Sequence, residues 1–125
     1  MAQLPPKEYD AANAGKKPKM TSKTYLVVRA TVADPADRGP FDHWYATEHL
    51  PDALKAFAVP RAWRAWSRTD PAVHCAFYEF PSLAAAEAGT SGPAIAALIG
   101  EFDRVWQKRV VRSRELLEFA GELAA

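Results

Sequence analysis

The sequence predicts an α+β domain in which helices pack on one face of an antiparallel sheet. Two observations lead to this prediction: four segments have the β-branched or alternating character of strands, and two others carry apolar residues at helical spacing. A chain of 125 residues buries roughly two-thirds of its unfolded surface, so an apolar core is available. The order of the segments along the chain then decides how the layers are connected.

The first half of the chain supplies a strand, a helix and a hairpin. Residues 24–33, TYLVVRATVA, are apolar on both alternating faces, as in a strand covered on both sides. After the turn DPADRGP, we expect Pro40 at the first position of a helix that runs to about Phe57, since a proline there loses no intrahelical hydrogen bond. Strands over 59–68 and 73–80 follow, and the short turn TDPA between them indicates an antiparallel hairpin.

The second half supplies a short helix, a long helix and a last strand. Ser82 is a good N-cap for a helix that ends at Gly89, and residues 93–106 place their apolar side chains on one helical face. Residues 110–119 are ambiguous between strand and continued helix, and we expect a strand. The resulting order β-α-β-β-α-β is that of a ferredoxin-like sandwich with a four-stranded antiparallel sheet.

The face of this sheet that the helices leave open needs a cover, because the first strand is apolar on both sides. A large bare apolar face promotes aggregation. A second sheet from another copy of the chain, related by two-fold symmetry, is the natural cover, so we expect a homodimer.

Composition and charge exclude several classes of protein. Sixteen Lys and Arg against fifteen Asp and Glu leave a net charge of +1, which argues against a nucleic-acid partner. The single Cys75 cannot form an internal disulfide. With no secretory signal and no apolar run that spans a bilayer, we expect a cytoplasmic protein without a membrane partner. Residues 1–22 are expected to form a flexible arm and residues 23–125 a single folded domain.

The segment FDHWYATEHLPDAL, residues 41–54, gives its helix two apolar sides. At about 100° per residue, Phe41, Trp44 and Tyr45 fall on one side of the helix. Leu50, Leu54 and Phe57 fall on nearly the opposite side. Pro51 removes a backbone hydrogen bond and clashes with the carbonyl of Thr47, so we expect the axis to bend and the buried face to change there. The alternative is that both sides are buried, one on the sheet and one on a partner subunit.

A polar flank follows the same helix in steps of three, four and three residues, through Asp42, Tyr45, His49 and Asp52. We predict a catalytic group here, with His49 as general base, Asp52 fixing its tautomer and Tyr45 sharing its proton. The alternative is structural: His49 and Tyr45 cap backbone groups that the kink at Pro51 leaves free.

Beside this flank we expect a ligand pocket between the helix, the long second helix and the sheet. The expected ligand-binding residues are Trp44, Glu48, Trp66, Phe77 and Phe102. Glu48 is expected to be a buried carboxylate paired with Arg64 or Arg29, since burying an unpaired charge is costly.

No metal site is expected. His43 and His49 are six residues apart and point to different sides of their helix, and a set of His49, Asp52 and the distant His74 has little to support it. We expect His74 in the core or at an interface.

Three further residues are assigned no role in the chemistry. The paired Arg112 and Arg114 are expected on a solvated or interface face. Cys75 lies in the middle of a strand without a basic partner, so it is not expected to act as a nucleophile.

The run DHWYATEHLPDAL after an apolar first strand, followed by RAWRAWSR and AFYEFPSL, resembles the dimeric α/β-barrel superfamily, and within it the EthD-like and antibiotic-biosynthesis-monooxygenase-like groups. The likeness covers about Tyr25 to Phe119. It implies the fold and a dimer more than an activity, because the relatives include cofactor-free oxygenases, haem-degrading enzymes, isomerases and cyclases. Polyketide-cyclase relatives carry an aromatic and His pair where this chain reads AEAGTSGPAIAA, so a cyclase would lose its acid and base.

These inferences favour a homodimeric α/β-barrel protein that binds a small apolar or aromatic molecule. For an enzyme, the resemblance implies a cofactor-independent oxygenase or isomerase, with His49 as the base and with neither a metal nor a tightly held nucleotide. The alternative is a non-catalytic ligand-binding or structural dimer, in which the same residues stabilise the kink and the interface. A third hypothesis, haem binding, would need His74 or His43 as the axial ligand.

Overall fold

A computed structural model describes residues 23–125, so the arm predicted for residues 1–22 lies outside the described part of the chain. Four strands form one antiparallel sheet in the order β2-β3-β1-β4. The strands are β1 (Thr24–Val32), β2 (Arg61–Trp66), β3 (Val73–Phe80) and β4 (Val110–Glu118). The helices are α2 (Pro35–Trp44), the π-helical turn η2 (Tyr45–His49), α3 (Leu50–Phe57), α4 (Leu83–Gly89), α5 (Pro93–Trp106) and the 3₁₀ turn η3 (Gln107–Arg109). This is the ferredoxin-like α+β sandwich that the sequence predicts.

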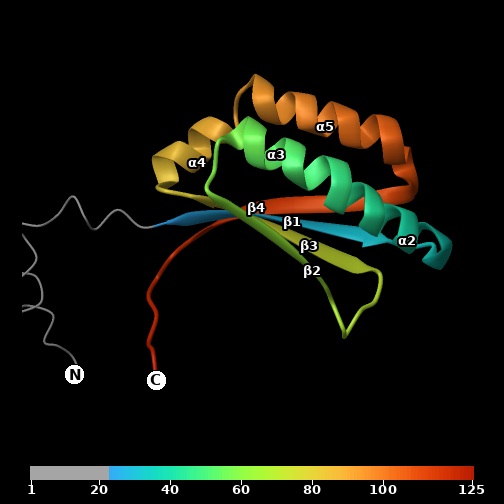
Figure 1. Ribbon diagram of the computed structural model, residues 1–125, viewed down its shortest axis with the longest axis horizontal. Coiled ribbons are helices and arrows are strands. Elements are labelled where there is room, and N and C mark those ends of the chain that lie inside the picture. Colours follow the sequence, from blue (N-terminus) through green and yellow to red (C-terminus); the bar gives the residue numbers. More distant parts are fainter. Residues whose placement is uncertain (1–22) are drawn as a thin grey trace, which may run out of the picture.

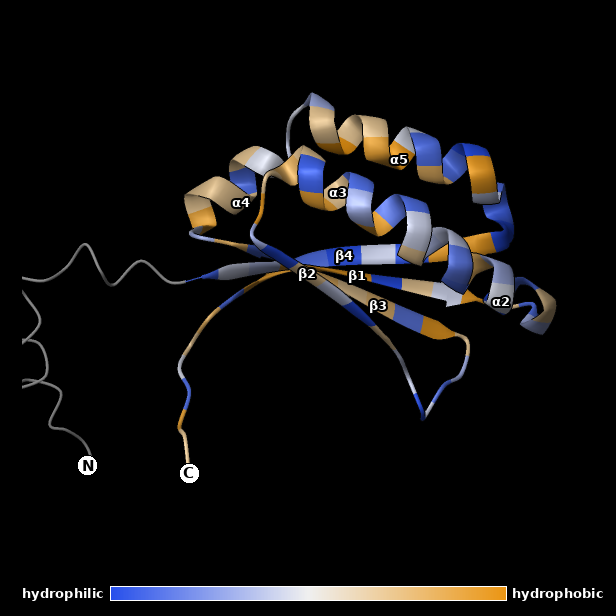
Figure 2. Ribbon diagram, viewed as in Figure 1, coloured by the Kyte–Doolittle hydropathy of each residue, from blue (hydrophilic) through white to orange (hydrophobic). Residues whose placement is uncertain are grey.

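The helices cover one face of the sheet, and the core lies between the two layers (Figure 1). Alternate residues of the two central strands point into this core, since side chains alternate across a strand. In β1 these include Leu26 and Ala30, which lie opposite Tyr78 and His74 of β3. Figure 2 shows that the amino-terminal half of α5 is largely hydrophobic, and the residues that α5 buries, Ile95, Phe102 and Trp106, lie along its whole length. Among residues 23–125, no helix is long and apolar enough to cross a lipid bilayer.

The first helix begins earlier than predicted, at Pro35 and not at Pro40. Asp34 forms the N-cap: its Oδ1 accepts a hydrogen bond from the backbone N–H of Ala36 at 2.9 Å. The pair Asp34-Pro35 is therefore the start signal, and Pro40 lies inside the helix. The strand predicted over 59–68 is shorter, at Arg61–Trp66, whereas the ambiguous segment after residue 110 is confirmed as a strand.

The second face of the sheet is not covered by any helix of residues 23–125 (Figure 1). Aromatic side chains gather on it: the rings of Trp63 and Phe77 stack at 5.3 Å, and Tyr25 meets the edge of Trp63 at 6.0 Å. At the β4 edge of the same face, Val111 is 71% exposed and Leu117 is 41% exposed. This face therefore keeps apolar surface in contact with solvent.

Candidate active site

A π-helical turn joins α2 to α3 at the polar segment that the sequence singles out. In this turn the backbone N–H of Leu50 donates to the carbonyl of Tyr45, five residues earlier. The proline that follows, Pro51, has no N–H to donate and would clash with the carbonyl four residues before it in a regular helix. Widening the helix by one residue is one way to accommodate such a proline, and π turns of this kind are frequent at functional sites.

The extra residue rotates the buried face of the helix, as the sequence requires, and brings His49 into the core. Residues five apart in an α-helix point about 140° away from each other. Here Trp44 and His49 stack with ring centroids 4.7 Å apart and planes at 18°. The ring of Tyr45 meets His49 edge-on at 4.9 Å, so the predicted neighbourhood of these two residues is confirmed. Both are buried, with His49 8% exposed and Tyr45 1% exposed.

A cavity of about 200 Å³ lies between the sheet and the helices α3 and α5, next to this turn. Its walls are mostly apolar, and they include Leu26, Val28, Phe57, Leu98, Ile99 and Phe102. Its polar groups include the side chains of Tyr45, His49, Tyr78, Arg112 and Arg114. Since an apolar cavity of about 150 Å³ is enough to hold benzene, this one has room for a small aromatic molecule.

Two buried tyrosines place a hydroxyl pair on the wall of the cavity. Tyr45 Oη and Tyr78 Oη are 3.0 Å apart and share a hydrogen bond. Burial raises the pKa of Tyr45 to about 12 and raises the pKa of Tyr78 further still. Both side chains are therefore neutral at neutral pH. One hydroxyl donates to the other, and the second keeps its own proton to donate to a bound molecule.

His49 is the titratable group on the same wall. Burial lowers its pKa to about 4, and the positive charge of Arg112 lowers it further in the same direction. The imidazole is therefore neutral at neutral pH. Its Nδ1 is buried and has no hydrogen-bond partner among residues 23–125. No hydrogen bond at Nδ1 therefore fixes which of the two ring nitrogens carries the proton.

Two acidic residues lie elsewhere than the sequence predicts. Asp52 is exposed and forms no hydrogen bond with His49, so the predicted orienting contact is absent between these two side chains. The prediction that Glu48 is buried is wrong, because this residue is exposed on the solvent side of the π turn. Its expected partners bind other carboxylates: Arg64 pairs with Asp42 at 2.7 Å and Arg29 with Glu115 at 2.7 Å.

Of the five residues expected to bind ligand, only Phe102 lines the cavity. Trp44 lies behind the wall and supports it by stacking on His49. Trp66 packs in the core against Phe41, at 6.1 Å between ring centroids. Phe77 stacks on Trp63 on the opposite face of the sheet, because it has the strand parity that points away from the helices.

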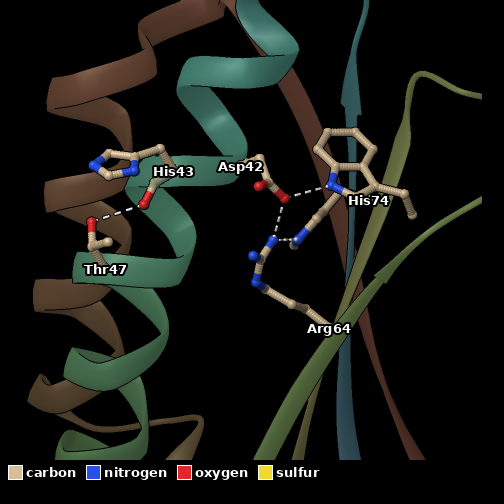
Figure 3. Close-up of polar contacts among 6 residues, drawn as sticks. Asp42, His43, Thr47, Arg64 and His74 are labelled. Atoms are coloured by element: carbon tan, nitrogen blue, oxygen red, sulfur yellow. Dashed lines mark hydrogen bonds and ion pairs between the residues drawn. The ribbon is translucent and has the colours of Figure 1, made fainter.

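Asp42, Arg64, Trp66 and His74 form a second polar cluster (Figure 3). Asp42 Oδ1 accepts hydrogen bonds from Arg64 Nη1 at 2.7 Å and Trp66 Nε1 at 2.8 Å. These bonds hold the pKa of the Asp42 carboxyl below its usual range, with the bond from Arg64 having the larger effect. The Arg64 Nη1 also lies 3.4 Å from His74 Nε2. Burial, followed by the charge of Arg64, lowers the pKa of His74 to about 4.

His74 lies in the core, which is one of the two positions, core or interface, that the sequence predicts for it. It is fully buried, and its ring lies 4.6 Å from the ring of Tyr45. The cluster around Asp42 therefore packs against Tyr45 through His74, and none of its residues lines the cavity. Among residues 23–125, no group of three or more His, Cys, Asp or Glu side chains is placed to hold a metal ion, and His49, Asp52 and His74 are not brought together.

Among the polar side chains of the cavity, the sequence analysis missed three: Tyr78, Arg112 and Arg114. Tyr78 has the same strand parity as His74, so its direction follows once His74 is known to face the helices. Arg112 and Arg114 alternate along β4 opposite Ala30 and Val28, which places both guanidinium groups on the helix side of the sheet. Their pairing with β1 is the signal, and it requires the strand order of the sheet.

Comparisons with known proteins support the fold. No protein-family model and no curated protein sequence matches the chain. A conserved protein of unknown function from Bacteroides thetaiotaomicron, named a possible oxidoreductase, is 19% identical with a TM-score of 0.57, over 79% of this chain and 99% of that one. HapK from Hahella chejuensis is 16% identical with a TM-score of 0.56, over 82% and 99% of the two chains. SnoaB, a cofactor-independent oxygenase from Streptomyces nogalater, is 14% identical with a TM-score of 0.52, over 82% and 96%.

Proposed function

We propose that the chain binds a small aromatic molecule in the cavity beside His49 and transforms it by proton abstraction, as a cofactor-independent oxygenase or isomerase. The observation that carries this proposal is a neutral, buried imidazole on the wall of an apolar cavity, with a hydroxyl pair and a guanidinium on the same wall. The sequence resemblance to the EthD-like and monooxygenase-like groups supports it, and so does the name of SnoaB.

His49 is the base in this proposal. Nε2 takes a proton from an acidic C–H or O–H group of the bound aromatic molecule. Because the apolar walls exclude water, the electrostatic interactions of the anion that forms are stronger than they would be in water. The lowered pKa means that His49 starts out unprotonated at neutral pH. It also makes the imidazolium a strong acid, which returns its proton readily.

The remaining polar groups stabilise the anion. The free hydroxyl proton of the Tyr45 and Tyr78 pair donates to it, and the guanidinium of Arg112 supplies a positive charge. In an isomerase, the proton returns to a different carbon of the same molecule. In an oxygenase, the anion of an activated CH₂ group reacts with O₂ to give a carbonyl and water, so that the substrate supplies all four electrons.

We further propose that the active form is a homodimer joined through the uncovered face of the sheet. The stacked Trp63 and Phe77, with Tyr25 at their edge, offer an apolar centre for such an interface. Glu79 beside them pairs with Arg61 and Lys23, which supplies a polar rim. The molar mass in solution, measured by light scattering during size-exclusion chromatography, tests this proposal. A mass of about twice 13.8 kDa supports the dimer, and a mass of 13.8 kDa contradicts it.

The catalytic proposal is tested by His49→Gln against a panel of quinols and polycyclic phenols, with oxygen uptake and product absorbance as readouts. We expect turnover to fall by at least about 100-fold, the usual contribution of a general base, while binding of the same compounds changes little. His43→Gln is the matched control, since His43 is exposed on the same helix. Unchanged turnover in His49→Gln would contradict His49 as the base. Binding without any turnover in the unaltered protein would leave a ligand-binding protein and no enzyme.

A further inference from the structure

The rim of the cavity is built for an anion. We propose that the ligand is an aromatic carboxylate, bound with its ring among the apolar walls and its carboxylate between the guanidinium groups of Arg112 and Arg114. This inference rests on the proposed function only in taking the cavity as the ligand site, and it names the chemical class of the ligand.

The two arginines lie on the same side of the sheet and line the same cavity because of their positions on β4. Residues two apart on a strand point to the same side and are separated by about 7 Å along it. Arg112 and Arg114 face the helix side of the sheet, opposite Ala30 and Val28 of β1, and both line the cavity. Two guanidinium groups at this separation can both reach one carboxylate, which is the group that their planar donors fit best.

The charges around the cavity are unbalanced. No Asp or Glu is among its lining residues. The nearest carboxylate partner is Asp103, which is 62% exposed and meets Arg112 Nη2 from outside at 3.1 Å. The side chain of Arg112 is 21% exposed and its guanidinium lies 3.8 Å from the centroid of the Phe102 ring, so most of the side chain is shielded from water. Its remaining donors are free to bind an acceptor on a ligand.

Arg114 differs from most other arginines of the chain in lacking an acidic partner. It forms no ion pair with residues 23–125, although it lines the cavity. Ion pairs with Asp or Glu are made instead by Arg29, Arg61, Arg64, Arg104 and Arg109. In Figure 2 the middle of β4 is hydrophilic, whereas the first half of α5 is largely hydrophobic. An amphiphile with a flat apolar body and one negative end matches this arrangement.

The test compares 2-naphthoate with its neutral analogue 2-naphthamide, by calorimetric titration of the full chain. We expect the naphthoate to bind at least about tenfold more tightly, and its affinity to fall as salt is raised, whereas that of the amide does not. Arg114→Gln should weaken naphthoate binding about fivefold to tenfold and leave the amide unchanged. Arg112→Gln should weaken it further, and Arg68→Gln, at an exposed position outside the cavity, is the control that should change neither.

The outcomes separate this inference from the proposed function. If the amide binds as tightly as the naphthoate, or if Arg114→Gln leaves the preference intact, the anion site is wrong and the cavity remains a ligand site. If neither compound binds, the cavity itself is not a ligand site and the proposed function fails with it. Because Arg114 is exposed, its substitution does not depend on the fold tolerating a change in the core.

Discussion

Mild acid should destabilise the fold through two buried imidazoles. The pKa of both His49 and His74 is lowered to about 4, first by burial, whereas a histidine in the unfolded chain has a pKa of about 6.5. Between these values the unfolded chain binds protons that the folded chain does not. Stability is therefore highest above about pH 6.5 and is lost as the pH falls toward 4.

The size of the effect follows from the same two values. At about pH 5 the unfolded state gains about 2 kcal/mol from each protonated histidine, so the two together remove about 4 kcal/mol of stability relative to about pH 7. This is a large fraction of the stability of an ordinary domain. The depressed pKa of the Asp42 carboxyl matters only below this window, so it does not obscure the effect.

Urea unfolding followed by circular dichroism at the two pH values measures this loss. His49→Gln should remove about half of the pH dependence, because one of the two buried imidazoles is gone. His43→Gln should leave the dependence unchanged, since His43 is exposed. The reasoning is refuted if the protein is equally stable at both pH values, or if His49→Gln keeps the full dependence.

Three further substitutions test the packing around the cavity. Tyr45→Phe should cost about 1–2 kcal/mol in urea unfolding, because it leaves the buried hydroxyl of Tyr78 without its partner; an unchanged midpoint would mean that the hydroxyls do not share a bond. Gly89→Ala should lower the melting temperature by several degrees, since its Cβ would lie 2.8 Å from Cε1 of the buried Phe80 ring; a neutral or higher value would show that the ring can shift. Ala53→Leu should abolish calorimetric binding of 2-naphthoate, because Ala53 is 1% exposed and lines the cavity; unaltered affinity would place the ligand elsewhere.

Periodicity in the sequence predicts the layers of the fold correctly but not every side chain on the polar helix. The contact between Tyr45 and His49 follows from their spacing and is confirmed. The predicted positions of Glu48 and Asp52 are wrong in the same way, because a period of 3.6 residues was carried through a turn that contains one extra residue. Pro51 predicts that the helix is irregular at this point. It does not predict which irregularity forms, because a kink and a π turn can both accommodate a residue without a backbone N–H.

The cavity depends on contacts between distant parts of the chain. Tyr78, Arg112 and Arg114 line the same cavity as His49 only because β4 and β3 both pair with β1, and no local sequence pattern specifies this pairing. Arg112 and Arg114 are two residues apart, which is the spacing of polar residues on one face of any half-exposed strand, so this spacing alone does not indicate a binding site. Sequence patterns therefore locate the base and its tyrosine neighbour, whereas the anion-binding side of the cavity requires the assembled sheet.

Nitrogen NMR of the imidazole rings tests most directly whether the cavity beside His49 is the ligand site. The chain has three histidines, so long-range proton–nitrogen spectra of the labelled protein resolve each ring. On saturation with 2-naphthoate at about pH 6.5, we expect the Nε2 signal of His49 to shift while those of the exposed His43 and the enclosed His74 stay in place. A His49 ring that does not respond to a bound ligand would contradict the account.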